Sequence, residues 1–229
     1  MMPTLPPVVT IDGPSASGKG TIAHLLAKKL HWHFLDSGIL YRAVGLAALQ
    51  ESVHPEKLSE ITALIHHIKI DMEFADISDD PKIFLNNHEV TEEIRGEACG
   101  KMASQVSTVP LVRAALLDRQ RNMRELPGLV TDGRDMGTVV FPDASVKFFF
   151  QASVEVRAQR RYNQLISRSQ NANLRDVLHE LRVRDERDAN RMISPTKPAA
   201  DAIILDTSNM TIEEVLKEVY QQVQAKLGV

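Results

Sequence analysis

A glycine-rich stretch follows a short apolar run near the start of the chain. Residues 8–11 read VVTI, and residues 13–21 read GPSASGKGT. The β-branched run predicts a buried strand, and the apolar spacing of residues 21–30 predicts a helix. Glycines between a strand and a helix let main-chain N–H groups turn inward around an anion, at the positive end of the helix. The stretch therefore predicts a phosphate-binding loop and an α/β fold.

The residue after the loop lysine departs from the common phosphate-loop pattern. Gly20 stands where that pattern has a Ser or Thr that binds magnesium, and the hydroxyl comes one residue later, at Thr21. We expect Lys19 to bring a mobile positive charge to the phosphates. We expect magnesium to be held through water and phosphate, with no direct protein ligand. Ala16 should have a negative φ, because alanine is disfavoured in the left-handed region.

The remaining hydrophobic pattern predicts a single domain. Further strands are expected at residues 32–35, 129–132, 146–152 and 202–206. Helices are expected over residues 36–50, 55–67, 97–107, 110–125, 153–169 and 173–191, and after a capping box formed by Thr211 and Glu214. Five strands separated by helices favour a doubly wound, five-stranded parallel sheet. Residues 68–90 hold short β-like pieces joined by turns at 78–81 and 86–87, which predicts a small antiparallel insert.

Composition narrows the class of protein further. The chain has 27 basic and 30 acidic side chains, so its overall charge does not favour nucleic acid as a partner. The single cysteine, Cys99, excludes an internal disulfide framework and a cysteine-cluster zinc site, and it fits a reducing cytoplasm. No apolar run approaches the ~18 residues of a membrane span, and the N-terminal residues lack the pattern of a signal peptide. We therefore expect a cytoplasmic protein with no membrane partner.

Arginines gather late in the chain. Residues 157–191 contain nine arginines, no lysine and five carboxylates. Arginine without lysine favours planar, bidentate recognition of phosphate. In a phosphate-loop protein such a segment predicts a lid that closes over the transferring phosphoryl group and excludes water. Nucleic-acid binding is the other reading, but only one aromatic residue, Tyr162, is interleaved with the arginines.

Polar clusters also follow two of the predicted strands. The first is DSGILYR at 36–42, and the second is GRDMGTVVFPDA at 133–144. Ligands bind at the carboxyl ends of the strands in open α/β sheets, so both clusters are candidates for an acceptor site. Arg42 could hold an anionic acceptor through two hydrogen bonds. Asp135, next to Arg134, is a candidate for the site or for a structural ion pair.

Together with SQVSTVPLVR at 104–113 and RDERDANR at 184–191, these motifs resemble the bacterial cytidylate kinases in order over nearly the whole chain. The resemblance implies one phosphate-loop kinase domain over residues 1–229, with a monophosphate-binding insert at about 37–107 and a lid at about 157–185. It implies phosphoryl transfer from ATP, with Mg²⁺, to CMP or dCMP. It also implies a monomer.

The resemblance assigns expected roles by position. ATP would be bound by Gly13, Pro14, Ser15, Ala16, Ser17, Gly18, Lys19, Gly20, Thr21 and Arg157. Ser104, Arg113 and Asp135 would read the cytosine, Arg184 and Asp188 would hold the ribose, and Arg42, Arg134 and Arg191 would grip the acceptor phosphate beside Ser37. Catalysis would depend on Lys19, Arg134, Arg160, Arg161 and Arg184. A carboxylate such as Asp135 accepts from the cytosine amino group and repels the corresponding uracil carbonyl.

Two alternatives stay open at the level of sequence. The first is another small-molecule kinase on the same fold, with UMP, AMP or shikimate as the acceptor. The second is a nucleotide-dependent nucleic-acid-binding protein that uses the arginine segment.

Overall fold

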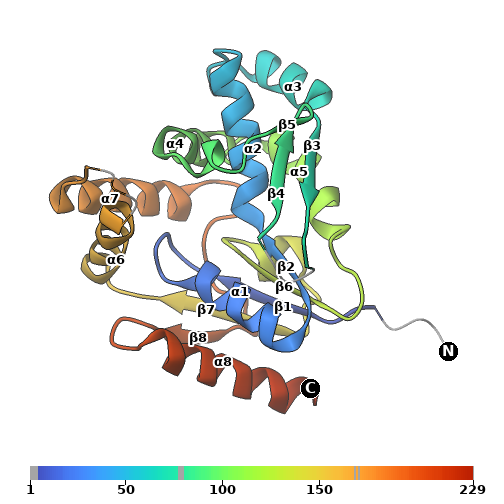
Figure 1. The fold of residues 1–229 in the computed structure, drawn as a ribbon, viewed down its shortest axis with the longest axis vertical. Coiled ribbons are helices and arrows are strands. Elements are labelled where there is room, and N and C mark those ends of the chain that lie inside the picture. The colour runs from blue at the N-terminus through green and yellow to red at the C-terminus, as the bar shows by residue number, and fades with distance from the viewer. Residues whose placement is uncertain (1–4, 77–79, 168, 170, 229) are drawn as a thin grey trace.

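A five-stranded parallel sheet forms the centre of the molecule (Figure 1). The computed structural model describes all residues except 1–4, 77–79, 168, 170 and 229. The strands are β1 (Val8–Asp12), β2 (His33–Asp36), β6 (Leu129–Gly133), β7 (Val146–Gln151) and β8 (Ile203–Asp206), and they lie in the order β2-β6-β1-β7-β8. The predicted fold class is confirmed, and strand β2 begins one residue later than expected. The turn predicted at 78–81 lies partly outside the described residues.

Helices pack against this sheet, against the smaller insert described below, or against each other. They are α1 (Lys19–Leu30), α2 (Ser37–Gln50), α3 (Leu58–His67), α4 (Glu97–Val106), α5 (Pro110–Arg121), α6 (Val154–Ser167), α7 (Leu174–Asn190) and α8 (Ile212–Leu227). On one face Val9 and Phe148 pack with α1 and α8. On the other face Val8 and Leu129 pack with η2 (Met136–Val140), a π-helical turn that the sequence did not predict. Because successive strand residues point to opposite faces, the apolar strands fill two cores at once.

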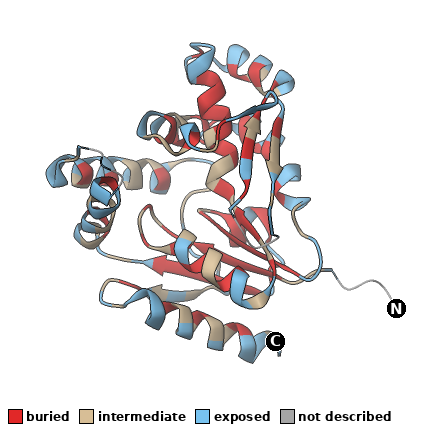
Figure 2. Ribbon diagram, in the orientation of Figure 1, coloured by how far each residue is buried: buried red, intermediate tan, exposed pale blue. Residues whose placement is uncertain are grey.

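The predicted antiparallel insert is present as a second, smaller sheet. It consists of β3 (Ile70–Glu73), β4 (Lys82–Leu85) and β5 (His88–Glu89), followed by the 3₁₀ turn η1 (Glu93–Arg95). Strands β3 and β4 share one hydrophobic core with helices α2 to α5. The insert lies above the parallel sheet in the view of Figure 1 and has its own buried interior in Figure 2.

The arginine-rich segment contains the two helices that the sequence predicted, α6 and α7. Helices α6 and α7 pack on each other through a small apolar cluster that includes Leu165 and Leu181. They project to one side of the molecule, and their outer faces are largely exposed (Figure 2). We call α6 and α7 the lid helices. None of the described helices is long and apolar enough to cross a membrane.

Candidate active site

The predicted phosphate loop lies between the end of β1 and the start of α1. Gly18 precedes the helix with φ 89°. A side chain at Gly13, where φ is 153°, would meet the carbonyl oxygen of Phe150 at 2.5 Å. Ala16 also has a positive φ, 60°, so the expectation of a negative φ is wrong. The inward turn of the loop imposes this left-handed conformation, although it costs a non-glycine residue roughly 1–2 kcal/mol.

Two lid arginines hold the loop from outside through its carbonyl groups. Arg157 donates to the Ser15 carbonyl at 3.2 Å, and its other nitrogens bind the Ala152 carbonyl and the Asp185 carboxylate. Arg160 donates to the Ser17 carbonyl at 3.3 Å, as does the Thr207 hydroxyl at 3.1 Å. The sequence analysis did not single out Thr207 or Asp185. Both arginines thus lie at the phosphate loop, where they contact its main chain.

Three carboxylates lie side by side at the carboxyl ends of the strands next to the loop. Asp36 is paired with Asp132 in the β2–β6 register, and Asp12 ends the neighbouring strand β1. Asp12 accepts main-chain N–H groups from Met136 at 2.9 Å and Gly137 at 2.8 Å. Burial nevertheless raises the pKa of Asp12 to about 6. Asp12 therefore ties the loop strand to η2, directly after Asp135.

Lys19 extends into this acidic edge of the sheet. Its Nζ lies 3.4 Å from the Pro14 carbonyl and 3.9 Å from Asp132. Burial and the neighbouring Arg134 lower the pKa of Lys19 to about 8. Burial and the neighbouring Asp36 raise the pKa of Asp132 to about 8, which favours its neutral form at pH 7. The Oδ1 atom of Asp132 has no hydrogen-bond partner among the described residues.

The residues expected to read the base are all buried, and we call this group the acceptor pocket: Ser104, Arg113 and Asp135. Arg113 pairs with Asp135, donates to the Ser107 carbonyl at 3.2 Å and lies over the Tyr41 ring. Asp135 is 2% exposed. The Ser104 hydroxyl is buried and accepts a hydrogen bond from Arg187 at 3.1 Å. Arg187 was not among the predicted site residues.

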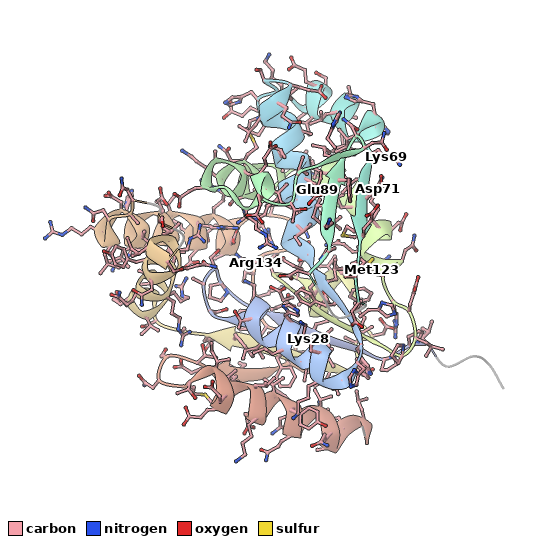
Figure 3. The ribbon with its side chains drawn as sticks, in the orientation of Figure 1. Lys28, Lys69, Asp71, Glu89, Met123 and Arg134 are labelled. Atoms are coloured by element: carbon pink, nitrogen blue, oxygen red, sulfur yellow. The ribbon has the colours of Figure 1, made fainter. Side chains whose placement is uncertain are left out.

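Arg134 connects the phosphate loop to the lid. Its Nη2 donates to the Ser15 hydroxyl at 2.6 Å, and its Nε pairs with Asp188 of α7 at 2.9 Å. In Figure 3 Arg134 lies in the middle of the molecule, between the lid helices and α1. A single guanidinium therefore touches both the phosphate loop and helix α7.

Positive charge exceeds negative charge around Asp188. We call Arg134, Arg184 and Arg191 with Asp188 the arginine cluster. Although burial opposes it, the neighbouring Arg134 and Arg184 hold the pKa of Asp188 below its ordinary value. Burial and Arg134 lower the pKa of Arg184 to about 10. The Nε of Arg184 and the Nη2 of Arg191 are buried without a hydrogen-bond partner in the described part of the chain. Unpaired buried donors on cations are suited to bind an anion.

Three further predicted residues lie around this cluster. Arg42 donates to the carbonyls of Ile94 and Gly96 in the insert, at 2.8 and 3.3 Å. Arg161 of the lid lies 3.9 Å from Glu97 of α4. Ser37 is buried next to Gly133, where an added side chain would meet its hydroxyl at 2.6 Å.

Several of these residues line one of two cavities. A cavity of about 810 Å³ lies in front of the loop and is lined by residues 16–21, Arg42, Arg160, Arg161, Thr207 and Met210, among others. A second cavity, of about 590 Å³, is lined by Thr108, Pro110, Arg187, Asn190, Arg191, Met192 and Ile193. The first is large enough for a nucleotide. The structure thus brings the loop and part of the lid together in one cavity, and it places the acceptor pocket apart from them, beside Arg187.

A phosphate-binding loop on a doubly wound sheet, facing a cluster of guanidinium groups, defines a phosphate-loop kinase. The chain belongs to the cytidylate kinase family, whose family model matches residues 9–225. It is 52% identical over 217 residues to a cytidylate kinase of Stutzerimonas stutzeri (strain A1501), covering 95% of each chain. It is 48% identical over 227 residues to that of Aeromonas salmonicida (strain A449), covering 99% of this chain and 98% of the relative. The protein is therefore an ATP-dependent nucleoside monophosphate kinase, as the motifs implied.

Proposed function

We propose that this enzyme transfers the γ-phosphoryl group of ATP to CMP or dCMP, giving ADP and CDP or dCDP. The observation that carries the proposal is the arginine cluster, which has unpaired N–H groups on Arg184 and Arg191 and contacts the phosphate loop through Arg134 and Ser15. An acceptor phosphate fits the surplus positive charge, and a base fits the paired groups beyond it. This reaction serves the recycling of pyrimidine nucleotides.

On the donor side the phosphates of ATP bind to the main-chain N–H groups of residues 13–21 and to Lys19. Arg157 and Arg160 keep the loop in shape through the carbonyls of Ser15 and Ser17. Mg²⁺ fits beside this loop because the buried Oδ1 of Asp132 is a free acceptor for a metal-bound water. The metal neutralises phosphate charge when it is bound.

On the acceptor side Asp135 accepts from the amino group of cytosine, which uracil lacks. Arg113 pairs with that carboxylate and holds it in place. Arg184 and Asp188 hold the ribose, and Arg42, Arg134 and Arg191 hold the acceptor phosphate, with Ser37 beside it. A base that leaves these buried groups unpaired loses roughly 1–3 kcal/mol for each of them.

The chemistry needs no protein nucleophile. The acceptor phosphate is already largely ionised at neutral pH, so its oxygen attacks the γ-phosphorus directly and the bond to the β-phosphate oxygen breaks. Lys19, Arg134, Arg160, Arg161 and Arg184 stabilise the charge that spreads over the transferring group. Closure of the lid, at about residues 157–185, over the insert, at about 37–107, excludes water.

We further propose that the enzyme works as a monomer in the cytoplasm. The resemblance to the cytidylate kinases is what suggests a monomer. Cys99 is a free, buried thiol, which suits a reducing compartment.

An acceptor panel tests the proposed function. ADP release from MgATP would be followed with CMP, dCMP, UMP, AMP and shikimate, beside a control without acceptor. We expect strong turnover with CMP and dCMP and weak turnover with UMP. Faster turnover with AMP, UMP or shikimate would contradict the assignment of the acceptor pocket and leave the phosphate loop unaffected.

A further inference from the structure

Arg187 links a lid helix to the pocket that reads the base. It lies on α7, and its Nη1 donates to the Ser104 hydroxyl of α4 at 3.1 Å. Ser104 is 5% exposed, so this contact is shielded from water on the Ser104 side. Arg187 also lines the smaller cavity together with Arg191, a member of the arginine cluster.

The Ser104 contact belongs to a continuous network of hydrogen bonds. The Ser104 carbonyl accepts from the Ser107 hydroxyl at 3.0 Å, and the Ser107 carbonyl accepts from Arg113 at 3.2 Å. Arg113 in turn pairs with Asp135. Arg187 therefore stands at the far end of the network that holds the base-reading carboxylate.

The chemistry of the contact fixes the direction of the Ser104 hydroxyl. A guanidinium has donors only, so Ser104 accepts from Arg187 with a lone pair. The hydroxyl hydrogen must then point away from Arg187. Ser104 becomes a hydrogen-bond donor toward its remaining neighbours, and a buried donor is costly when it has no acceptor.

We propose that Arg187 is a positioning residue for base specificity, which turns the Ser104 hydroxyl so that it donates to the unprotonated ring nitrogen of cytosine. Uracil carries an N–H at the same ring position, so two donors would face each other. Asp135 and Ser104 then read adjacent groups of the base with opposite polarity: the carboxylate accepts and the hydroxyl donates. This inference rests on the proposed function, because it needs CMP as the acceptor.

Arg182 provides a matched control on the same helix. It pairs with Glu155 at 3.1 Å, and the two side chains are 60% and 63% exposed. Arg182 is not part of the acceptor pocket. Arg182→Met removes the same charge and the same functional group as Arg187→Met, without touching Ser104.

The test is the ratio of kcat/KM for CMP to kcat/KM for UMP, measured on the full chain at saturating MgATP. We expect Arg187→Met to lower this ratio roughly tenfold, mainly through CMP, because one charge-assisted hydrogen bond is lost. Arg187→Lys keeps a donor and should stay closer to the wild-type ratio. Arg182→Met should leave the ratio unchanged.

A double-substitution cycle separates positioning from a general structural effect. If Arg187 acts through Ser104, adding Arg187→Met to Ser104→Ala should lower the ratio no further. Effects that multiply, or equal losses for CMP and UMP in Arg187→Met, would overturn the inference. A wild-type chain that does not phosphorylate CMP would refute the proposed function instead, so the two failures are distinguishable.

Discussion

The donor side and the acceptor side of this site are built in different ways. The phosphate loop is one continuous segment between β1 and α1, and we propose that its main-chain groups do most of the binding of phosphate. The acceptor pocket takes Ser104 from α4, Arg113 from α5 and Asp135 from the turn after β6, and Arg187 of α7 joins them through side-chain hydrogen bonds. The loop is therefore held by backbone conformation, whereas the pocket is held by pairing between distant side chains.

Because of this difference, we expect amino-acid substitutions to have different effects on the two sides. A main-chain site keeps its shape when a side chain is exchanged, so a substitution there removes one contact with the ligand. In a pocket of paired side chains, replacing one residue also removes the contact that orients its partner. Substitutions on the donor side should lower turnover with any acceptor, and those on the acceptor side should change which acceptor is used.

The largest effect should come from Lys19→Met on the donor side. The lysine brings charge to the phosphates, and its loss should lower kcat about 10³-fold with CMP and with dCMP alike. The thermal unfolding temperature should change little, because the loop is held by its main chain and by Arg157 and Arg160. Lys29→Met, on the same helix over the Tyr220 ring, is the control. Near-normal turnover would contradict the role of Lys19.

Arg134→Lys should have the next largest effect, because Arg134 touches both sides. Lysine keeps the charge, but it cannot bind Ser15 and Asp188 together with the planar geometry of a guanidinium. We expect kcat to fall about 10²-fold and the KM values for ATP and CMP both to rise. Steady-state kinetics with each substrate varied in turn would check this. A change in only one of the two KM values would show that Arg134 does not connect the donor side to the acceptor side.

Asp132→Asn should have the smallest effect, and it should appear in stability. The folded-state pKa of Asp132, about 8, lies above its ordinary value of 3.8, so the folded protein binds this proton more tightly than the unfolded chain. The free energy of unfolding should therefore fall as the pH rises from about 4 to about 8. The Asn variant lacks this loss, so its advantage over the wild type should grow steadily across that range.

Urea unfolding at pH 5, 6.5 and 8, without nucleotide or divalent metal, would measure that difference. Asp206→Asn is a suitable control, because its carboxyl is exposed at the far edge of the sheet and its pKa is lowered by its hydrogen bonds to Ser208. A difference between wild type and Asp132→Asn that does not change with pH would show that Asp132 is ionised throughout.

The donor side could be predicted from sequence because its signal is local. Nine consecutive residues, the strand before them and the helix after them specify the loop, and only the φ of Ala16 was misjudged. The carboxylates Asp12 and Asp132 were missed, since each ends an apolar strand and its role depends on a neighbouring strand. A charged residue at the end of a buried run is the signal that could have indicated them.

The acceptor side could not be derived from local pattern. Ser104 and Arg187 are 83 residues apart in the chain, and nothing in either segment indicates that they meet. The residue roles came from resemblance to a family, and Arg187 was left out of them. Arg157 was assigned to ATP by the same resemblance, and in the structure its guanidinium binds the loop's main chain and Asp185.

The most direct test of the central claim is calorimetric titration of CMP and of UMP into the protein without ATP. A pocket of side chains that are paired with one another should bind CMP without the donor, and UMP at least about tenfold more weakly. In Asp135→Asn this difference should shrink, because an amide can donate as well as accept. Equal affinities for CMP and UMP in the wild type, or CMP binding that appears only when an ATP analogue is added, would contradict the account.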